Sequence, residues 1–469
     1  MIMKKYIKKL TAALLAVSVT IALGSCGSKQ ASVTDDQGRT IITVGGWTNK
    51  EGKQRDALIE RKTLFEQENP DVVVEGDEWT FSLDTFLAKA TGGELPTVYS
   101  TYFTEIAQII DSGYSADLTD VLKERGYEGQ FNQDILDLVT KDGKIYAFPV
   151  SAYALGLGYN TELFEQAGLT EADGTPKQPK DWDELVEFAK QIKEKTGIPG
   201  FVFPTAGNQG GWFFTALAWS YGVEFVEKNE DGKWMATFDT PECVEALQWI
   251  KDLKWKHDVV PIDTIIDGDK YYEIFSTGKA GMMIAPGNYS DYVIQYGMTP
   301  DQLGLMAIPA GPAKHVTLIG GELQSVSSEA TPEQIDAAVR WIETRYNYKA
   351  TDTFKQTTET AIDKKLSDGA LVGVKSLSVW DENAESAAFE NALIDEKCNI
   401  NPNQVRLYNE FIQDPCELHP EVTVCAQELY AILDDCITQV FRDENADCAA
   451  IIKTANEQFQ SDYLDNISF

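Results

Sequence analysis

The sequence has few of the side chains on which metal and nucleophile chemistry depends. Its 469 residues include only three histidines and seven cysteines. No histidine lies in an HExxH motif, and no two cysteines have the CxxC spacing of a zinc site. The GxxxxGK[ST] phosphate loop, the GxSxG elbow of hydrolases and a GxGxxG fingerprint are also missing. These absences predict a protein with no metal, no cofactor and no catalytic residues.

Positive charge is also scarce. Lysine and arginine number 40 against 74 aspartates and glutamates, which gives a formal net charge of −34. Such a surface repels nucleic acid, phosphate-rich ligands and anionic membranes. With 43% hydrophobic residues the chain can nevertheless bury a sizeable core. The ligand of the folded part is therefore expected not to be an anion.

The first 40 residues predict a secretion signal followed by a membrane anchor. Four lysines precede the apolar run Leu10–Leu23, which is shorter than the roughly 20 residues that span a membrane. The sequence LGSC, ending at Cys26, resembles the lipobox of bacterial lipoproteins. We therefore expect residues 1–25 to be a signal peptide and residues 26–40 a flexible tether lipidated at Cys26. This predicts a location on the outer face of the cell membrane, with the lipid anchor as the only membrane contact.

Six cysteines follow the predicted anchor. An even number outside the cytoplasm permits disulfides. The last three lie in segments with helical periodicity, where a buried free thiol packs as a small apolar group. Paired and free states both stay open for Cys243, Cys398, Cys416, Cys425, Cys436 and Cys448.

Alternating strand and helix patterns predict an α/β fold. The apolar run Ile41–Val44, the periodic segment Arg55–Glu68 and the run Val72–Val74 indicate a strand, a helix and a second strand. Such a unit begins a doubly wound sheet.

The stretch Asp142–Leu169 predicts three elements in one run. Asp142-Gly143 is a hairpin turn, and an extended segment follows it. Asn160 is suited to begin a helix and Gly168 to end it.

This stretch resembles the inter-lobe crossing of the family 1 extracellular solute-binding proteins of ATP-binding cassette (ABC) importers, of the maltodextrin and multiple-sugar-binding type. NPDVVVE from Asn69, PKDWDEL from Pro179 and FSTGKAGMM from Phe275 resemble further motifs of that family in the same order. The resemblance implies an α/β, two-lobed periplasmic-binding-protein-like fold of class II, with lobes joined by three crossing segments. Lobe 1 is then expected to take residues 41–152 and 303–350, and lobe 2 residues 153–302 and 351–469.

Aromatic side chains stand at predicted strand ends and loops, where open α/β sheets bind ligands. Sugar rings stack on aromatic faces, and their hydroxyl groups need hydrogen-bonding partners. Gly207–Gly211 is expected to be a flexible loop that delivers Trp212 to the cleft. For each aromatic residue taken singly, a role in packing stays open. The candidate ligand-binding residues are Trp47, Trp79, Tyr102, Tyr153, Trp212, Asn288, Tyr289 and Glu322.

The resemblance implies a binding protein and not an enzyme. We expect a monomer that captures an extracellular neutral carbohydrate, an oligosaccharide, between its lobes and delivers it to a membrane permease, without nucleic acid. Two alternatives stay open. One is binding of a polyamine or another small solute by the same fold, through acidic groups and cation–π contacts. The other is a lipid-anchored glycoside hydrolase that uses a pair of carboxylates.

Overall fold

The computed structural model of the chain describes residues 33–287 and 294–467. Cys26, Asn288 and Tyr289 lie outside the described residues, as do the predicted signal peptide and residues 26–32 of the predicted tether. Within the described ranges, no helix combines the length and the apolar character needed to cross a membrane.

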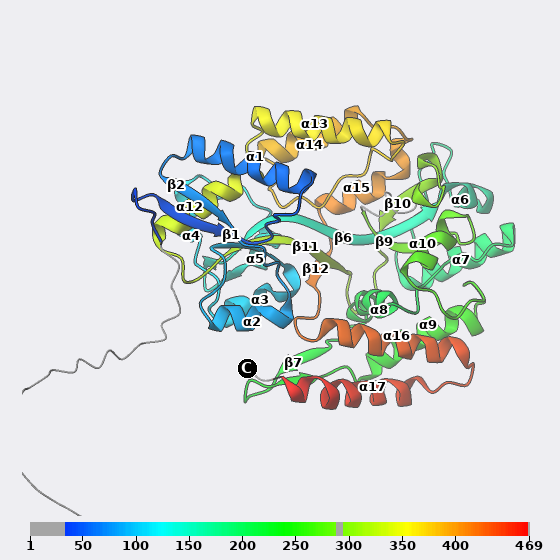
Figure 1. The fold of residues 1–469 in the computed structure, drawn as a ribbon. Coiled ribbons are helices and arrows are strands. Elements are labelled where there is room, and N and C mark those ends of the chain that lie inside the picture. Colours follow the sequence, from blue (N-terminus) through cyan, green and yellow to red (C-terminus); the bar gives the residue numbers. More distant parts are fainter. Residues whose placement is uncertain (1–32, 288–293, 468–469) are drawn as a thin grey trace, which may run out of the picture. The chain divides into compact units, whose positions relative to one another are not determined.

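An eight-stranded sheet runs through the described chain (Figure 1). β1 pairs in parallel with β2 and β3, as the strand–helix–strand pattern predicts. Next to them, β11 pairs in antiparallel fashion with β3 and β6, and β6 with β9 and β10. The strands of this sheet are β1 (Thr40–Val44), β2 (Val72–Gly76), β3 (Val98–Tyr102), β6 (Phe148–Asn160), β9 (Met282–Pro286), β10 (Leu303–Ala307), β11 (Val316–Val326) and β12 (Glu417–Pro420), which pairs with β11.

The long strand β6 makes the predicted crossing (Figure 1). Its first part, Phe148–Ala154, pairs with β11, whereas its last part, Leu155–Asn160, pairs with β9 and β10. The first and last parts of this one strand therefore pair with different strands of the sheet. β11 provides the antiparallel return beside the first part of β6.

The elements on either side of β6 are also as predicted. β4 (Thr140–Lys141) and β5 (Lys144–Ile145) form the hairpin before it. After it, the Asn160 side chain accepts a hydrogen bond from the N–H of Leu163 at the start of α6 (Thr161–Ala167). Gly168 ends that helix in the left-handed conformation, with φ of 73°.

The first hydrophobic core surrounds β1, β2 and β3. Helices α1 (Lys53–Glu68), α4 (Thr119–Glu124) and α12 (Pro332–Glu343) contribute buried residues to it. In this core, Phe65 of α1 and Trp341 of α12 meet edge to face at 5.3 Å.

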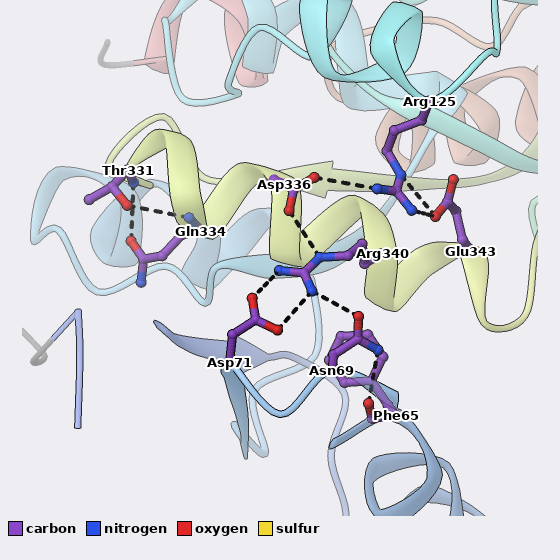
Figure 2. Close-up of polar contacts among 9 residues, drawn as sticks. All are labelled: Phe65, Asn69, Asp71, Arg125, Thr331, Gln334, Asp336, Arg340 and Glu343. Carbon is purple, nitrogen blue, oxygen red and sulfur yellow. Dashed lines mark hydrogen bonds and ion pairs between the residues drawn. The ribbon is translucent and has the colours of Figure 1, made fainter. Parts of the chain in front are cut away.

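Polar contacts hold α12 in register with this core (Figure 2). Arg340 donates to Asn69 and to Asp71, at 2.8 Å each, in the turn before β2. Arg125 Nε donates to Glu343 at 2.9 Å. Because these groups are partly exposed, each pair contributes at most about 1 kcal/mol and fixes orientation more than stability.

The second, larger core surrounds the last part of β6 and extends into the C-terminal helices. Trp182 begins α7 and is 2% exposed, and its indole donates to Ser220 at 2.9 Å. It is buried at the start of the helix. Other elements of the described chain are α2 (Leu83–Thr91), α3 (Phe103–Asp111), α5 (Gln133–Asp137), α7 (Trp182–Thr196), α8 (Gln209–Ser220), β7 (Val226–Lys228), β8 (Trp234–Ala236), α9 (Pro241–Trp255), α10 (Gly268–Ser276), η2 (Pro300–Gln302), α13 (Asp352–Ser367), α14 (Glu385–Glu396), η3 (Pro402–Gln404), α15 (Arg406–Gln413), α16 (Ala426–Arg442), α17 (Cys448–Asp462) and η4 (Leu464–Asn466).

The chain after residue 350 packs against both cores. Trp380 stacks on Phe131 of the first core at 5.0 Å. Tyr408 of α15 belongs to the second core, and its hydroxyl donates to Ala154 O at 3.3 Å. The predicted lobe boundaries stay a prediction.

The six cysteines after the predicted anchor are free thiols. Cys243, Cys436 and Cys448 are buried, and burial raises the pKa of Cys436 to about 12. These three therefore pack as small apolar groups, which is one of the two states left open by their spacing.

Candidate ligand-binding site

Three predicted site residues are neighbours across β3, β11 and β6. Glu322 of β11 is paired with Tyr102 of β3 on one side and with Ser151 of β6 on the other. Gly320 of β11 is paired with Tyr153. A side chain at position 320 would approach the Tyr153 hydroxyl to 2.2 Å, so the glycine lets this ring lie against β11.

The Glu322 carboxylate is held by its neighbours. It accepts hydrogen bonds from Ser100 Oγ at 2.7 Å and from Gln324 Nε2 at 3.2 Å. Its own N–H donates to Ser151 Oγ at 3.2 Å. The carboxylate is partly exposed, so it can still accept a hydrogen bond from a ligand beside Tyr102.

Trp79 and Tyr102 are linked by a third ring. Phe81 lies 6.2 Å from Trp79 and 6.1 Å from Tyr102, edge to face in both pairs. The Trp79 indole donates to Thr85 at 2.9 Å, and Tyr102 is 44% exposed. The two predicted aromatics thus share one continuous aromatic surface.

Trp47 lies next to the backbone of Trp79, because the N–H of the preceding residue, Gly46, donates to Trp79 O at 2.7 Å. Its ring packs on Gly76, where a side chain would come within 2.2 Å of the indole, and it borders the first core. In the part of the chain that the structure describes, its ring contacts no other candidate ring. The structure therefore gives Trp47 a packing environment.

Trp212 stands on the first turn of α8 and not after a flexible loop. The helix begins at Gln209, so Gly210 and Gly211 are helical, which corrects the predicted loop Gly207–Gly211. The physical reason is that Asp434, on α16, accepts hydrogen bonds from backbone N–H groups at this helix start. Trp212 itself is partly buried, and its ring lies 4.8 Å from that of Phe213.

Glu421, which follows β12, has two aromatic neighbours. Tyr430 of α16 donates its hydroxyl to Glu421 Oε2 at 2.7 Å. The Trp212 side chain lies near enough to this carboxyl group to affect its pKa. Burial raises the pKa of Glu421, and the Tyr430 and Trp212 side chains oppose the increase.

Tyr153 joins the same cluster. Burial raises the pKa of Tyr430 well above its usual value, and the charge of Glu421 and the neighbouring Tyr153 and Glu105 raise it further. Tyr153 also borders a cavity of about 270 Å³, whose wall includes Tyr408 and Ser376.

Glu105, in the first turn of α3, is the second carboxyl group of the cluster. Its Oε2 is buried and has no hydrogen-bond partner among the described residues. Burial, followed by the charge of Glu421, raises the pKa of Glu105 to about 7. Within the described ranges, no lysine or arginine contributes to the pKa shift of either carboxyl group. The pair therefore suits a ligand that donates hydrogen bonds and carries no negative charge.

Sequence reasoning missed Glu105, Glu421 and Tyr430. A signal existed for Glu105, because it lies three residues after β3, at the carboxyl end of a strand in parallel pairing. Glu421 and Tyr430 fall in the last hundred residues, where no motif singles them out.

Comparisons with known proteins point to one family. The model of the bacterial extracellular solute-binding proteins matches residues 45–344, more than half of the chain. A putative binding protein of Brucella abortus (strain 2308) is 29% identical over 312 residues, which are 65% of this chain and 70% of that protein. The maltodextrin-binding protein MdxE of Bacillus subtilis (strain 168) is 25% identical over 350 residues, which are 72% of this chain and 76% of that protein.

A solved structure shows the same fold. The cyclic alpha-maltosyl-1,6-maltose binding protein of Arthrobacter globiformis superposes with a TM-score of 0.61 at 23% identity, over 90% of this chain and 98% of that one. This likeness confirms the predicted two-lobed α/β fold of periplasmic binding proteins. With the family match over residues 45–344, it follows that the chain belongs to the bacterial extracellular solute-binding proteins.

Proposed function

We propose that the protein is the solute-binding component of an ABC importer that captures a neutral oligosaccharide outside the cell and delivers it to a membrane permease. Membership of a family of solute-binding proteins supports binding rather than catalysis. The names of relatives support a carbohydrate ligand, since they include a maltodextrin-binding, a multiple sugar-binding and an arabinooligosaccharide-binding protein.

One observation carries this proposal: aromatic rings cluster around Glu105 and Glu421, two carboxyl groups whose pKa no described lysine or arginine shifts. A sugar ring has apolar C–H faces that stack on an aromatic ring such as Trp212. Its hydroxyl groups donate hydrogen bonds without bringing a charge, which suits Glu421 and the unpartnered Oε2 of Glu105. Glu105 belongs to predicted lobe 1 and Glu421 to predicted lobe 2, so a ligand bound to both favours the closed arrangement.

The other candidates extend the proposed site along lobe 1. Tyr102 and Glu322 are paired across β3 and β11, and Trp79 continues the aromatic surface through Phe81. A surface longer than one ring supports an oligosaccharide as ligand. Asn288 and Tyr289 stay candidates on the sequence alone, and Trp47 is the weakest of the set.

The proposal includes a lipid anchor at Cys26 on the outer face of the membrane and a monomeric state. The lipobox-like sequence supports the anchor, and the net charge of −34 disfavours direct contact of the folded part with anionic lipid.

A polyamine is the second candidate ligand, because aromatic rings beside two carboxyl groups whose pKa no described lysine or arginine shifts also suit an ammonium group. A thermal-shift screen of the mature chain against maltotetraose, arabinotetraose, chitotetraose and spermidine separates the two. A ligand present at 100 times its Kd adds about 2.7 kcal/mol to the stability. A shift with spermidine alone would replace the carbohydrate by the polyamine.

The same samples test the hydrolase alternative. We expect the bound oligosaccharide to be recovered unchanged after long incubation with stoichiometric protein. Shorter products that disappear when one carboxylate is substituted would instead establish a glycoside hydrolase.

A further inference from the structure

Helix α8, which carries Trp212, is attached to α16 at its first turn. The carboxylate of Asp434, on α16, accepts the Asn208 N–H at 2.6 Å through Oδ2 and the Gly211 N–H at 2.7 Å through Oδ1. The Asp434 side chain is buried, with the residue 6% exposed. The first N–H groups of a helix have no partner within the helix, so Asp434 does from α16 what an N-cap residue normally does locally.

The residue at the N-cap position does not do this. Asn208 has no capping hydrogen bond, and its amide donates instead to the carbonyl and the side chain of Gln427, at 3.1 Å each. Asn208 is therefore a second link from α8 to α16. The N–H groups of Asn208 and Gly211, at the start of α8, therefore both have their hydrogen-bond acceptor on α16.

Two glycines allow close backbone contacts at the first turn of α8, one with α16 and one with the segment that precedes α8. A Cβ on Gly211 would lie 2.1 Å from the carbonyl oxygen of Tyr430, and one on Gly210 would lie 2.6 Å from that of Pro204. No side chain fits into these distances, so the first turn of α8 is pressed directly on the turn of α16 that carries Tyr430.

One face of α16 makes all these contacts. Gln427, Tyr430, Asp434 and Thr438 are spaced by three or four residues, which places them on the same side of the helix. Thr438 Oγ1 donates to Thr205 O at 3.0 Å, so the contact continues along the segment that leads into α8. The face that receives α8 is thus the face from which Tyr430 reaches Glu421.

We propose that Asp434 is a positioning residue of the ligand site, which fixes the first turn of α8 so that Trp212 and Tyr430 reach the same Glu421 carboxylate. It acts through Trp212 and does not touch the ligand itself. The ligand-dependent part of this role rests on the proposed function, whereas the position of Trp212 can be measured without any ligand.

The first experiment measures that position in the ligand-free mature chain. The protein is labelled with 5-fluorotryptophan, and the ¹⁹F resonance of Trp212 is the one of the ten tryptophan signals that Trp212→Phe removes. Asp434→Asn places an amide donor against two backbone donors, so we expect the Trp212 resonance to shift or broaden while the Trp182 resonance stays. A folded Asp434→Asn protein with an unmoved Trp212 resonance would overturn the proposal.

Asp447 provides the matched control. It also accepts two backbone N–H groups at a helix start, from Ala449 at 3.0 Å and Ala450 at 3.2 Å, but it caps α17. Asp447→Asn should leave the Trp212 resonance in place, and a shift as large as that of Asp434→Asn would mean that capping in general, and not Asp434, sets it. If Asp434→Asn does not fold, Asp434→Glu replaces it, because it keeps a carboxylate but moves it relative to the N–H groups of Asn208 and Gly211, and the same shift of the Trp212 resonance is expected.

The second experiment measures maltotetraose affinity in a double-mutant cycle. We expect Asp434→Asn to weaken binding about tenfold in the parent and to have no further effect in a Trp212→Ala background. An equal loss in both backgrounds would show that Asp434 does not act through Trp212. If the parent binds none of the screened carbohydrates, the proposed function fails while the ¹⁹F result still decides the role of Asp434.

Discussion

Replacing Trp212 by alanine distinguishes two possible roles of this residue, stacking on the ligand and packing in the core. Trp212 is partly buried, so the ring already packs on Phe213 and leaves a limited area for a ligand. A tryptophan buries at most about 250 Å², and if roughly 50 Å² of it is left for a sugar, covering it contributes about 1 kcal/mol. Stacking adds about 0.5 to 1.5 kcal/mol. The expected loss of affinity is therefore about 2 kcal/mol, or roughly 30-fold in Kd.

The free energy of unfolding should fall more in Trp182→Ala than in Trp212→Ala. This order is the opposite of the expected order for the loss of sugar affinity. Trp182 is 2% exposed and its indole is hydrogen-bonded to Ser220, so Trp182→Ala should cost about 3 to 5 kcal/mol of stability. Trp212→Ala should cost less, because its ring is only partly buried. We expect Trp182→Ala to retain the parent's affinity wherever it stays folded.

The assay is urea unfolding of the ligand-free proteins together with calorimetric titration by the best-binding carbohydrate. A Trp212→Ala protein that loses several kcal/mol of stability and binds the sugar as the parent does would refute the placement of Trp212 in the site. The aromatic argument would then rest on Tyr153, Tyr102 and Trp79.

Three further predictions concern the carboxyl pair, the contact between the predicted lobes and the anchor. Because the pKa of Glu105 is raised to about 7 in the folded chain, its ionisation opposes folding, and this cost grows from about pH 4.5 to pH 7 and is constant above that. Glu105→Gln should thus gain stability relative to the parent by at most about 1.4 kcal/mol per pH unit across that window, and an equal gain at pH 5 and pH 8 in urea titrations would contradict it. Lys228 of the β7–β8 hairpin, in predicted lobe 2, lies 3.5 Å from Asp111 of α3, in predicted lobe 1. Because both side chains are exposed, Lys228→Ala should weaken sugar binding by no more than about fivefold, and by less at 0.5 M salt. Cys26→Ser should release the protein from the membrane fraction without changing its sugar affinity; retention in that fraction would exclude the lipid anchor.

The crossing could be predicted from the sequence because its signals are local. The turn at Asp142, the cap at Asn160 and the left-handed Gly168 each act within about four residues of their own position. The extended segment between them needs only a continuous run without a helix start. The strands that pair with β6 are β9, β10 and β11, which lie more than 120 residues later in the chain.

Trp212 was expected in the site, but its local structure was predicted wrongly. Glycines at 207, 210 and 211 suggest a loop, because glycine is unfavourable in a helix by about 1 kcal/mol. In the structure, the carboxylate of Asp434, 223 residues away from Gly211, provides the missing partners of the helix start. A helix can therefore begin at a sequence that disfavours it when a distant side chain satisfies its N–H groups.

The carboxyl pair shows why the centre of the proposed site could not be predicted from residue types. With 74 aspartates and glutamates, the presence of Glu105 or Glu421 in the sequence carries almost no information. What distinguishes them is that α3 and the segment after β12 bring them into one partly buried place, where no described lysine or arginine shifts the pKa of either group. In so acidic a chain most carboxylates remain ionised and hydrated, and a buried pair persists only where something offsets the cost of burial. Tyr430 and Trp212 offset part of it at Glu421, whereas the buried Oε2 of Glu105 has no partner among the described residues, in keeping with its raised pKa.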